Sequence, residues 1–94
     1  MQARVSTYRF SGENIAENID RFRTALQATG LEDMKEAVLL IDRSSGKAIS
    51  ITYWEDEEAI ARSRQAADTA REGAAAAGGG AVESVEEYEV ALRQ

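Results

Sequence analysis

The chain has 94 residues, the length of one small domain with a modest core. Because it contains neither cysteine nor histidine, its composition excludes disulfides, the usual zinc sites, iron–sulfur clusters, thiol nucleophiles and the commonest general base. Its 17 acidic and 11 basic residues give a formal net charge of −6, and no two basic residues are adjacent, so we expect no nucleic-acid partner.

The first two predicted elements are a strand and a helix. Residues 4–10 (RVSTYRF) mix β-branched and aromatic side chains, which is typical of a strand. Over residues 14–29 apolar side chains recur at helical spacing, with Ser11 as a candidate cap and Gly30 at the end. The apolar stripe of this helix consists of Ile15, Ile19, Phe22 and Leu26.

The middle of the chain predicts a β-hairpin. Residues 35–42 (KEAVLLID) and 47–54 (KAISITYW) are rich in strand-forming side chains and flank a short Arg-Ser-Ser-Gly turn. Residues 38–41 and much of 49–54 are apolar on both faces, which a strand requires only when both of its faces are covered. The chain's own helices can cover one face, and we expect a second subunit to cover the other.

A second helix and a last strand complete the predicted order. Asp56 is expected to cap a helix that runs to about residue 77, with two glutamates in its first turn. This position explains the acidic run 55–58 better than a metal site does, so we expect no bound metal. Residues 83–92 form the last strand, with Tyr88 and Glu87 on opposite faces. The buried side of the helix is unusually small: Ala59, Ile60, Ser63, Ala66, Ala67, Ala70 and Ala74.

The order of these elements is β-α-β-β-α-β, the split βαβ pattern. Right-handed crossovers would place the first and third strands in the centre of the sheet and both helices on one face. We therefore predict one α+β domain over residues 1–94, with a ferredoxin-like fold and a four-stranded antiparallel sheet. Its open sheet face predicts a homodimer, the dimeric α/β barrel arrangement.

Residues 39–63 (LLIDRSSGKAISITYWEDEEAIARS) resemble the antibiotic biosynthesis monooxygenase-like (ABM) group of the dimeric α/β barrel superfamily. The resemblance lies in a strand, a short polar turn, the segment GKAISITYWEDEEA and a Trp-acidic opening to a helix; a closing strand, VESVEEYEVAL, follows. It implies a homodimer with a small-molecule cleft between the sheet and the helices of each subunit. Some relatives are cofactor-free oxygenases acting on polyphenolic or quinone-like compounds, so the resemblance implies no cofactor.

Another branch of this group degrades haem, and the resemblance argues against that activity here. Trp54 corresponds to the structural tryptophan at the end of the strand. Counted forward from it, the tryptophan and the haem-binding histidine of that branch fall near Ser63 and Gly73, and neither residue matches.

Polar side chains on the central strands are candidates for ligand binding. Ser6 and Tyr8 share one face of the first strand, and Ser50 and Thr52 share one face of the third. If these strands are neighbours, the four hydroxyls converge and can orient a ligand. Asn18 on the first helix is placed to reach the rim of the same pocket. The alternative is that serine and threonine are ordinary residues of half-buried strands.

Tyr53 and Trp54 complete the ligand-binding candidates, and no residue is assigned a catalytic role. Trp54 is suited to stacking on a planar ligand, and the Tyr53 hydroxyl to donating a hydrogen bond. However, neighbours on a strand point to opposite faces, so the alternative is that one fills the core and the other the dimer interface. Likewise, the small side of the second helix either lies close on the sheet or leaves a pocket.

Three functions stay open. One is a cofactor-independent monooxygenase acting on a small aromatic or quinone-like compound in the sheet–helix cleft, with Tyr8, Tyr53 or Asp42 as the available bases. The alternatives are a non-catalytic module that binds a small hydrophobic ligand and a dimerisation module without one. No apolar stretch reaches about 20 residues and the first residues lack an apolar signal core, so we expect a cytoplasmic protein and no membrane partner.

Overall fold

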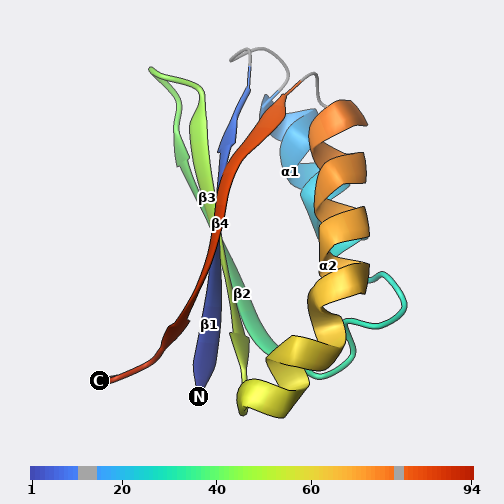
Figure 1. Cartoon of the computed structure of the whole chain (residues 1–94). Helices are drawn as coiled ribbons and strands as arrows, with labels where there is room; N and C mark the ends of the chain where they lie inside the picture. Colours follow the sequence, from blue (N-terminus) through green and yellow to red (C-terminus); the bar gives the residue numbers. More distant parts are fainter. Residues whose placement is uncertain (11–14, 78–79) are drawn as a thin grey trace.

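The computed structural model describes residues 1–10, 15–77 and 80–94, which form helices and strands in the predicted order (Figure 1). The expected cap Ser11 and the first residue of the expected helix, Asn14, lie outside the described residues. The elements are β1 (Gln2–Arg9), α1 (Ile15–Ala25), β2 (Met34–Asp42), β3 (Lys47–Trp54), α2 (Glu57–Ala77) and β4 (Ala81–Glu89).

Two element ends differ from the prediction for physical reasons. The helix expected up to residue 29 ends at Ala25. The Leu26 amide still bonds four residues back, but the amides of Gln27 and Ala28 bond to carbonyls three residues back in tighter turns. The last strand ends at Glu89 rather than at residue 92, because Glu89 pairs with Gln2, the first residue of β1. One further backbone bond, from the Val90 amide to the Met1 carbonyl at 2.9 Å, lies beyond the paired residues of β1.

The strands form one antiparallel sheet in the order β2-β3-β1-β4. The predicted central position of β1 and β3 and the ferredoxin-like α+β fold are therefore confirmed. Both helices cover the same face of the sheet, and the opposite face is bare in Figure 1. Any site enclosed by this chain alone therefore lies between the sheet and the helices.

The second helix begins and packs as its sequence dictates, with one exception. The Asp56 carboxylate accepts a hydrogen bond from the Ala59 amide at 2.8 Å, which is the predicted cap. The buried side includes the predicted Ala59, Ile60, Ser63 and Ala67, but it continues with Arg71 and Ala75. The predicted Ala66, Ala70 and Ala74 are only half-buried, because they lie toward the gap between α2 and α1.

Two apolar clusters hold the helices on the sheet. One surrounds Trp54 and Ile60, which are 1% and 2% exposed, with contributions from Leu31 and Ala67. The other surrounds Tyr8, whose ring stacks on Phe10 and meets Phe22 edge-on. Phe22 belongs to α1, so this helix is tied to the sheet through aromatic contacts.

The opposite face of the sheet is apolar at its centre. Ile49 and Ile51 alternate with the buried residues of β3 and are half-buried, and Val5 of β1 lies opposite Ile51. Leu40 of β2 and Tyr88 of β4 stay about half exposed. We call this set the open face; it is the surface that the predicted dimer would bury.

Candidate functional site

Two small cavities lie between the sheet and the helices and share Tyr8, Phe22 and Ala74 as lining residues. The first, here called the apolar cavity, is lined mostly by aliphatic and aromatic side chains and has a volume of about 30 Å³. The second, here called the polar cavity, has a volume of about 40 Å³ and is lined by hydroxyl groups, Trp54 and two arginines. Each therefore has room for a few water molecules.

The predicted hydroxyls converge on the polar cavity. The register of β1 and β3 pairs Ser6 directly with Ser50 and places Thr52 opposite Arg4. The Tyr8 hydroxyl lies 3.2 Å from the Ser50 hydroxyl, and all four predicted side chains line the cavity. We call Ser6, Tyr8, Ser50 and Thr52 the hydroxyl row. Its convergence follows from the strand order; ligand binding by it stays a prediction.

The other three predicted ligand residues lie in three different places. Trp54 lines the polar cavity, and its indole nitrogen donates to the Thr52 hydroxyl at 3.0 Å. Asn18 of α1 lines the apolar cavity; its side-chain oxygen accepts from Arg21, and its nitrogen has no partner among the described residues. Tyr53 lies on the open face beneath the Arg93 guanidinium, away from both cavities.

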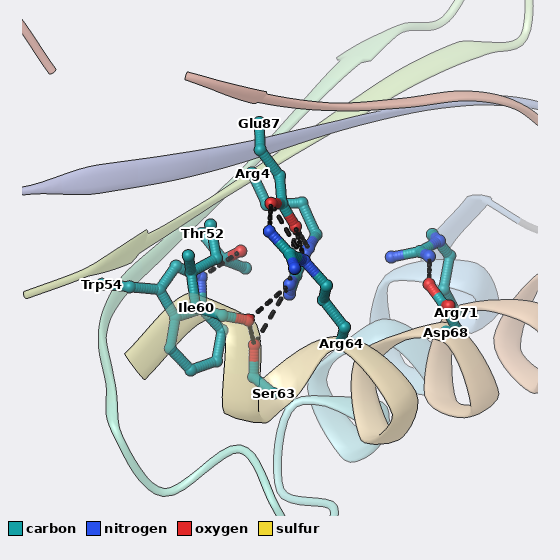
Figure 2. Close-up of polar contacts among 9 residues, drawn as sticks. All are labelled: Arg4, Thr52, Trp54, Ile60, Ser63, Arg64, Asp68, Arg71 and Glu87. Atoms are coloured by element: carbon teal, nitrogen blue, oxygen red, sulfur yellow. Dashed lines mark hydrogen bonds and ion pairs between the residues drawn. The ribbon is translucent and has the colours of Figure 1, made fainter. Parts of the chain in front are cut away.

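Arg4 is a buried cation in the wall of the polar cavity, only 3% exposed. Its Nη2 donates to the Glu87 carboxylate, the Ile60 carbonyl and the Ser63 hydroxyl, each at 3.0–3.1 Å (Figure 2). The guanidinium lies 5.4 Å from the centre of the Trp54 ring. Its other terminal nitrogen, Nη1, is buried and makes no hydrogen bond within the described chain. The two N–H groups of this nitrogen are therefore without an acceptor among the described residues.

A second buried cation, Arg71, lines the same cavity from α2. It pairs with Asp68, one turn earlier on the same helix, and Figure 2 shows its guanidinium rising from α2 toward the sheet. Burial lowers the pKa of Arg4, Glu87 opposes that shift, and the positive charge of Arg71 adds to it. The two guanidiniums thus act on each other electrostatically.

Glu87 of β4 is the carboxylate that compensates the charge of Arg4. It also accepts hydrogen bonds from Arg64, an exposed residue of α2, at 2.6 and 3.2 Å. These bonds from Arg64, and then those from Arg4, hold the pKa of Glu87 below its usual value. Glu87 is therefore ionised at neutral pH and divides its charge between two arginines.

Both arginines were missed by the sequence reasoning, although each follows a visible pattern. Arg4 stands two and four residues before Ser6 and Tyr8, so strand alternation places it on their face. Arg71 follows Ala67 by four residues, so it continues the helical stripe that begins at Ile60. A signal was present in each case, but charged residues are rarely buried.

The resulting arrangement suits the binding of negative charge on an oxygen atom. Guanidinium N–H groups and hydroxyls are fixed donors in a cavity with apolar walls, where such hydrogen bonds gain strength. Within the described residues, no three acidic side chains gather where they would hold a metal ion. Across the same part of the chain, no helix combines the length and apolar character needed to cross a membrane.

Comparison with solved structures places the fold. The chain matches a candidate antibiotic biosynthesis monooxygenase from Deinococcus radiodurans with a TM-score of 0.62 at 16% identity, over 100% of this chain and 96% of that one. It matches a mutant form of SnoaB, a cofactor-independent oxygenase from Streptomyces nogalater, with a TM-score of 0.61 at 14% identity, over 99% and 93%. It matches protein YJCS with a TM-score of 0.56 at 16% identity, over 95% of this chain and 97% of that one.

Sequence comparisons add nothing to this assignment, since no protein-family model and no curated protein matches the chain. Identities of 14–16% show a shared fold and transfer no side-chain role to this chain. The order of elements and near-complete coverage agree with the resemblance found in residues 39–63. The chain therefore shares its fold with structures of antibiotic biosynthesis monooxygenase type.

Proposed function

We propose that this domain is a cofactor-independent monooxygenase that acts on a small aromatic or quinone-like compound at the hydroxyl row. The observation that carries the proposal is a row of inward hydroxyls, beside a buried guanidinium, in a fold shared with a cofactor-independent oxygenase. Cofactor-free oxygenation requires no redox group on the protein, because the carbanion of the substrate itself reacts with oxygen. The protein needs to remove a proton, orient the substrate and exclude water.

The reaction balances with molecular oxygen as the only oxidant. A CH₂ group of the substrate loses a proton, and its carbanion bonds to one oxygen atom. Cleavage of the O–O bond leaves that atom as a carbonyl and releases the other as water. Of the three candidate bases, only Tyr8 lines the cavities; Asp42 is exposed in the hairpin turn and Tyr53 is on the open face. We assign the proton transfer to the Tyr8 hydroxyl oxygen and the orientation of the substrate oxygen to Ser50.

The size of the cavities sets a condition on this proposal. An apolar cavity of about 150 Å³ admits benzene, whereas these two offer about 30 and 40 Å³. A ring therefore enters only if Phe22 or Leu26, half-buried side chains of α1 and the turn after it, move aside. The same small volume favours the alternative function, a non-catalytic module that binds a smaller ligand or none.

Oxygen uptake separates these functions. With anthrone- or quinol-type compounds and no added cofactor, we expect the protein to accelerate oxygen consumption. Tyr8→Phe keeps the ring that packs on Phe10 but removes the hydroxyl, and we expect it to lower the rate about 100-fold. Thr69→Ala removes an exposed hydroxyl from α2 and serves as the matched control. Uptake no faster than in protein-free buffer would leave only the binding or dimerisation role.

We also propose that the protein is a homodimer through the open face, in which a second copy covers the apolar surface of Ile49, Ile51 and Val5. A second copy fits because the surface belongs to the central strands and a two-fold axis pairs it with itself. Native mass at micromolar concentration is expected to show a dimer, and Ile51→Glu a monomer. A monomeric wild type would refute this. The single-domain organisation and the cytoplasmic location remain predictions.

A further inference from the structure

We propose that the polar cavity binds the carboxylate group of an organic ligand between Arg4 Nη1 and the Arg71 guanidinium. The inference rests on the proposed function only in taking this cavity as the ligand site. It adds the chemical class of the ligand: an acid, and not a neutral compound.

The first observation is the free side of Arg4. Three protein groups hold Nε and Nη2, so the guanidinium is fixed in place before any ligand arrives. Nη1 stays without a partner among the described residues although it is buried. A buried donor without a partner is costly, and a carboxylate oxygen would satisfy it with a charge-assisted hydrogen bond.

The second observation is the balance of charge around the cavity. Arg4 shares the carboxylate of Glu87 with the exposed Arg64, and the carboxylate partner of Arg71, Asp68, is 59% exposed. Arg4 and Arg71 are 3% and 9% exposed, so solvent screens their charges little. The two buried cations are therefore only partly compensated by carboxylates, and a bound anion would complete the compensation.

The third observation is the set of neighbours that would hold the second carboxylate oxygen. Ser6 and Thr52 line the same cavity, and Ser6 is buried. The volume of about 40 Å³ accommodates a carboxylate group more readily than a ring. The remainder of the ligand would extend past Phe22 toward the apolar cavity, which shares that residue.

Anion titrations followed by Trp54 fluorescence test this inference, because Trp54 is the single tryptophan and lies beside Arg4. At constant ionic strength, we expect acetate and benzoate to give saturable changes and to raise the melting temperature. Acetamide, benzamide and chloride are expected to do neither. Equal responses to acetate and acetamide, or to acetate and chloride, would overturn the proposal.

Variants connect the signal to the site. Arg71→Met is expected to weaken acetate and benzoate binding at least ten-fold, and Arg71→Lys to restore part of it. Arg62→Gln removes an exposed guanidinium of the same helix that pairs with Asp33 and does not line the cavity, so it should bind both anions as wild type does. If Arg71→Met and Arg62→Gln bind alike, the proposal fails. The readout is binding without turnover, so a failed oxygenase assay leaves this result intact.

Discussion

Replacing Glu87 by glutamine tests whether the buried charge of Arg4 depends on one carboxylate. The substitution keeps the shape of the side chain and removes its charge. Loss of one partner from a fully buried ion pair costs about 3–5 kcal/mol. Glu87 is 24% exposed and Arg4 keeps the Ile60 carbonyl and the Ser63 hydroxyl, so we expect a loss of about 2–3 kcal/mol in the free energy of unfolding.

Urea unfolding followed by Trp54 fluorescence measures this loss, with Glu83→Gln as the matched control. Glu83 pairs with Arg9 on the same strand pair, but both side chains are more than 40% exposed, so its loss should cost about 0.5 kcal/mol or less. If the two variants lose equal stability, Arg4 does not depend on Glu87 and the reasoning is wrong.

The same comparison has a defined dependence on pH. The pKa of Glu87 is lowered in the folded state, first by Arg64 and then by Arg4. Its contribution is therefore complete above the pKa of glutamate in the unfolded chain and is lost as pH falls through the lower folded value. We expect the stability difference between wild type and Glu87→Gln to be constant near neutral pH and to vanish in strong acid. A difference that grows on acidification would contradict the assignment.

Three further substitutions test the fold by thermal or urea unfolding. Gly30→Ala should destabilise by about 1–3 kcal/mol, because φ is +97° and the new methyl group would lie 2.7 Å from Ala66 Cβ. Gly73→Ala should instead stabilise by about 0.5–1 kcal/mol, since it is helical and a methyl group there meets nothing within 4 Å; equal signs for the two glycines would refute this account. Asp56→Ala should cost about 1 kcal/mol through loss of the cap, and no change would show that the cap is not needed.

The fold was predictable because its signals are local. The hairpin follows from two strand-like segments around a short turn, and the order β-α-β-β-α-β allows few topologies. The central position of β1 and β3 then brought the hydroxyl row together without any knowledge of register. The helix start at Asp56 was equally local, because a cap bonds to an amide only three residues away.

The charged part of the site was not predictable by the same means, because its partners are distant in sequence. Arg4 contacts Ser63 and Glu87, which lie 59 and 83 residues further along the chain. No periodicity relates these positions, so the sequence supports only the face on which Arg4 lies. On α2, helical periodicity alone allows the buried side to continue through Ala70 and Ala74 or through Arg71 and Ala75, and only packing on the sheet selects the second.

The two buried arginines differ in what their burial explains. Arg4 is accounted for within the chain: Glu87, Ile60 and Ser63 bind it and so join β1 to β4 and α2. Among the described residues Arg71 joins no other element, because its carboxylate partner Asp68 lies three residues earlier on the same helix and is 59% exposed. A pair of that spacing forms equally well on a solvated helix surface, so stability gives no reason to bury its cation. In a small domain with a modest core, the buried guanidinium of Arg71 is explained by the anionic ligand proposed for the cavity, which would also satisfy the Nη1 of Arg4. Arg71 is therefore the residue that best distinguishes a binding site from a structural ion pair.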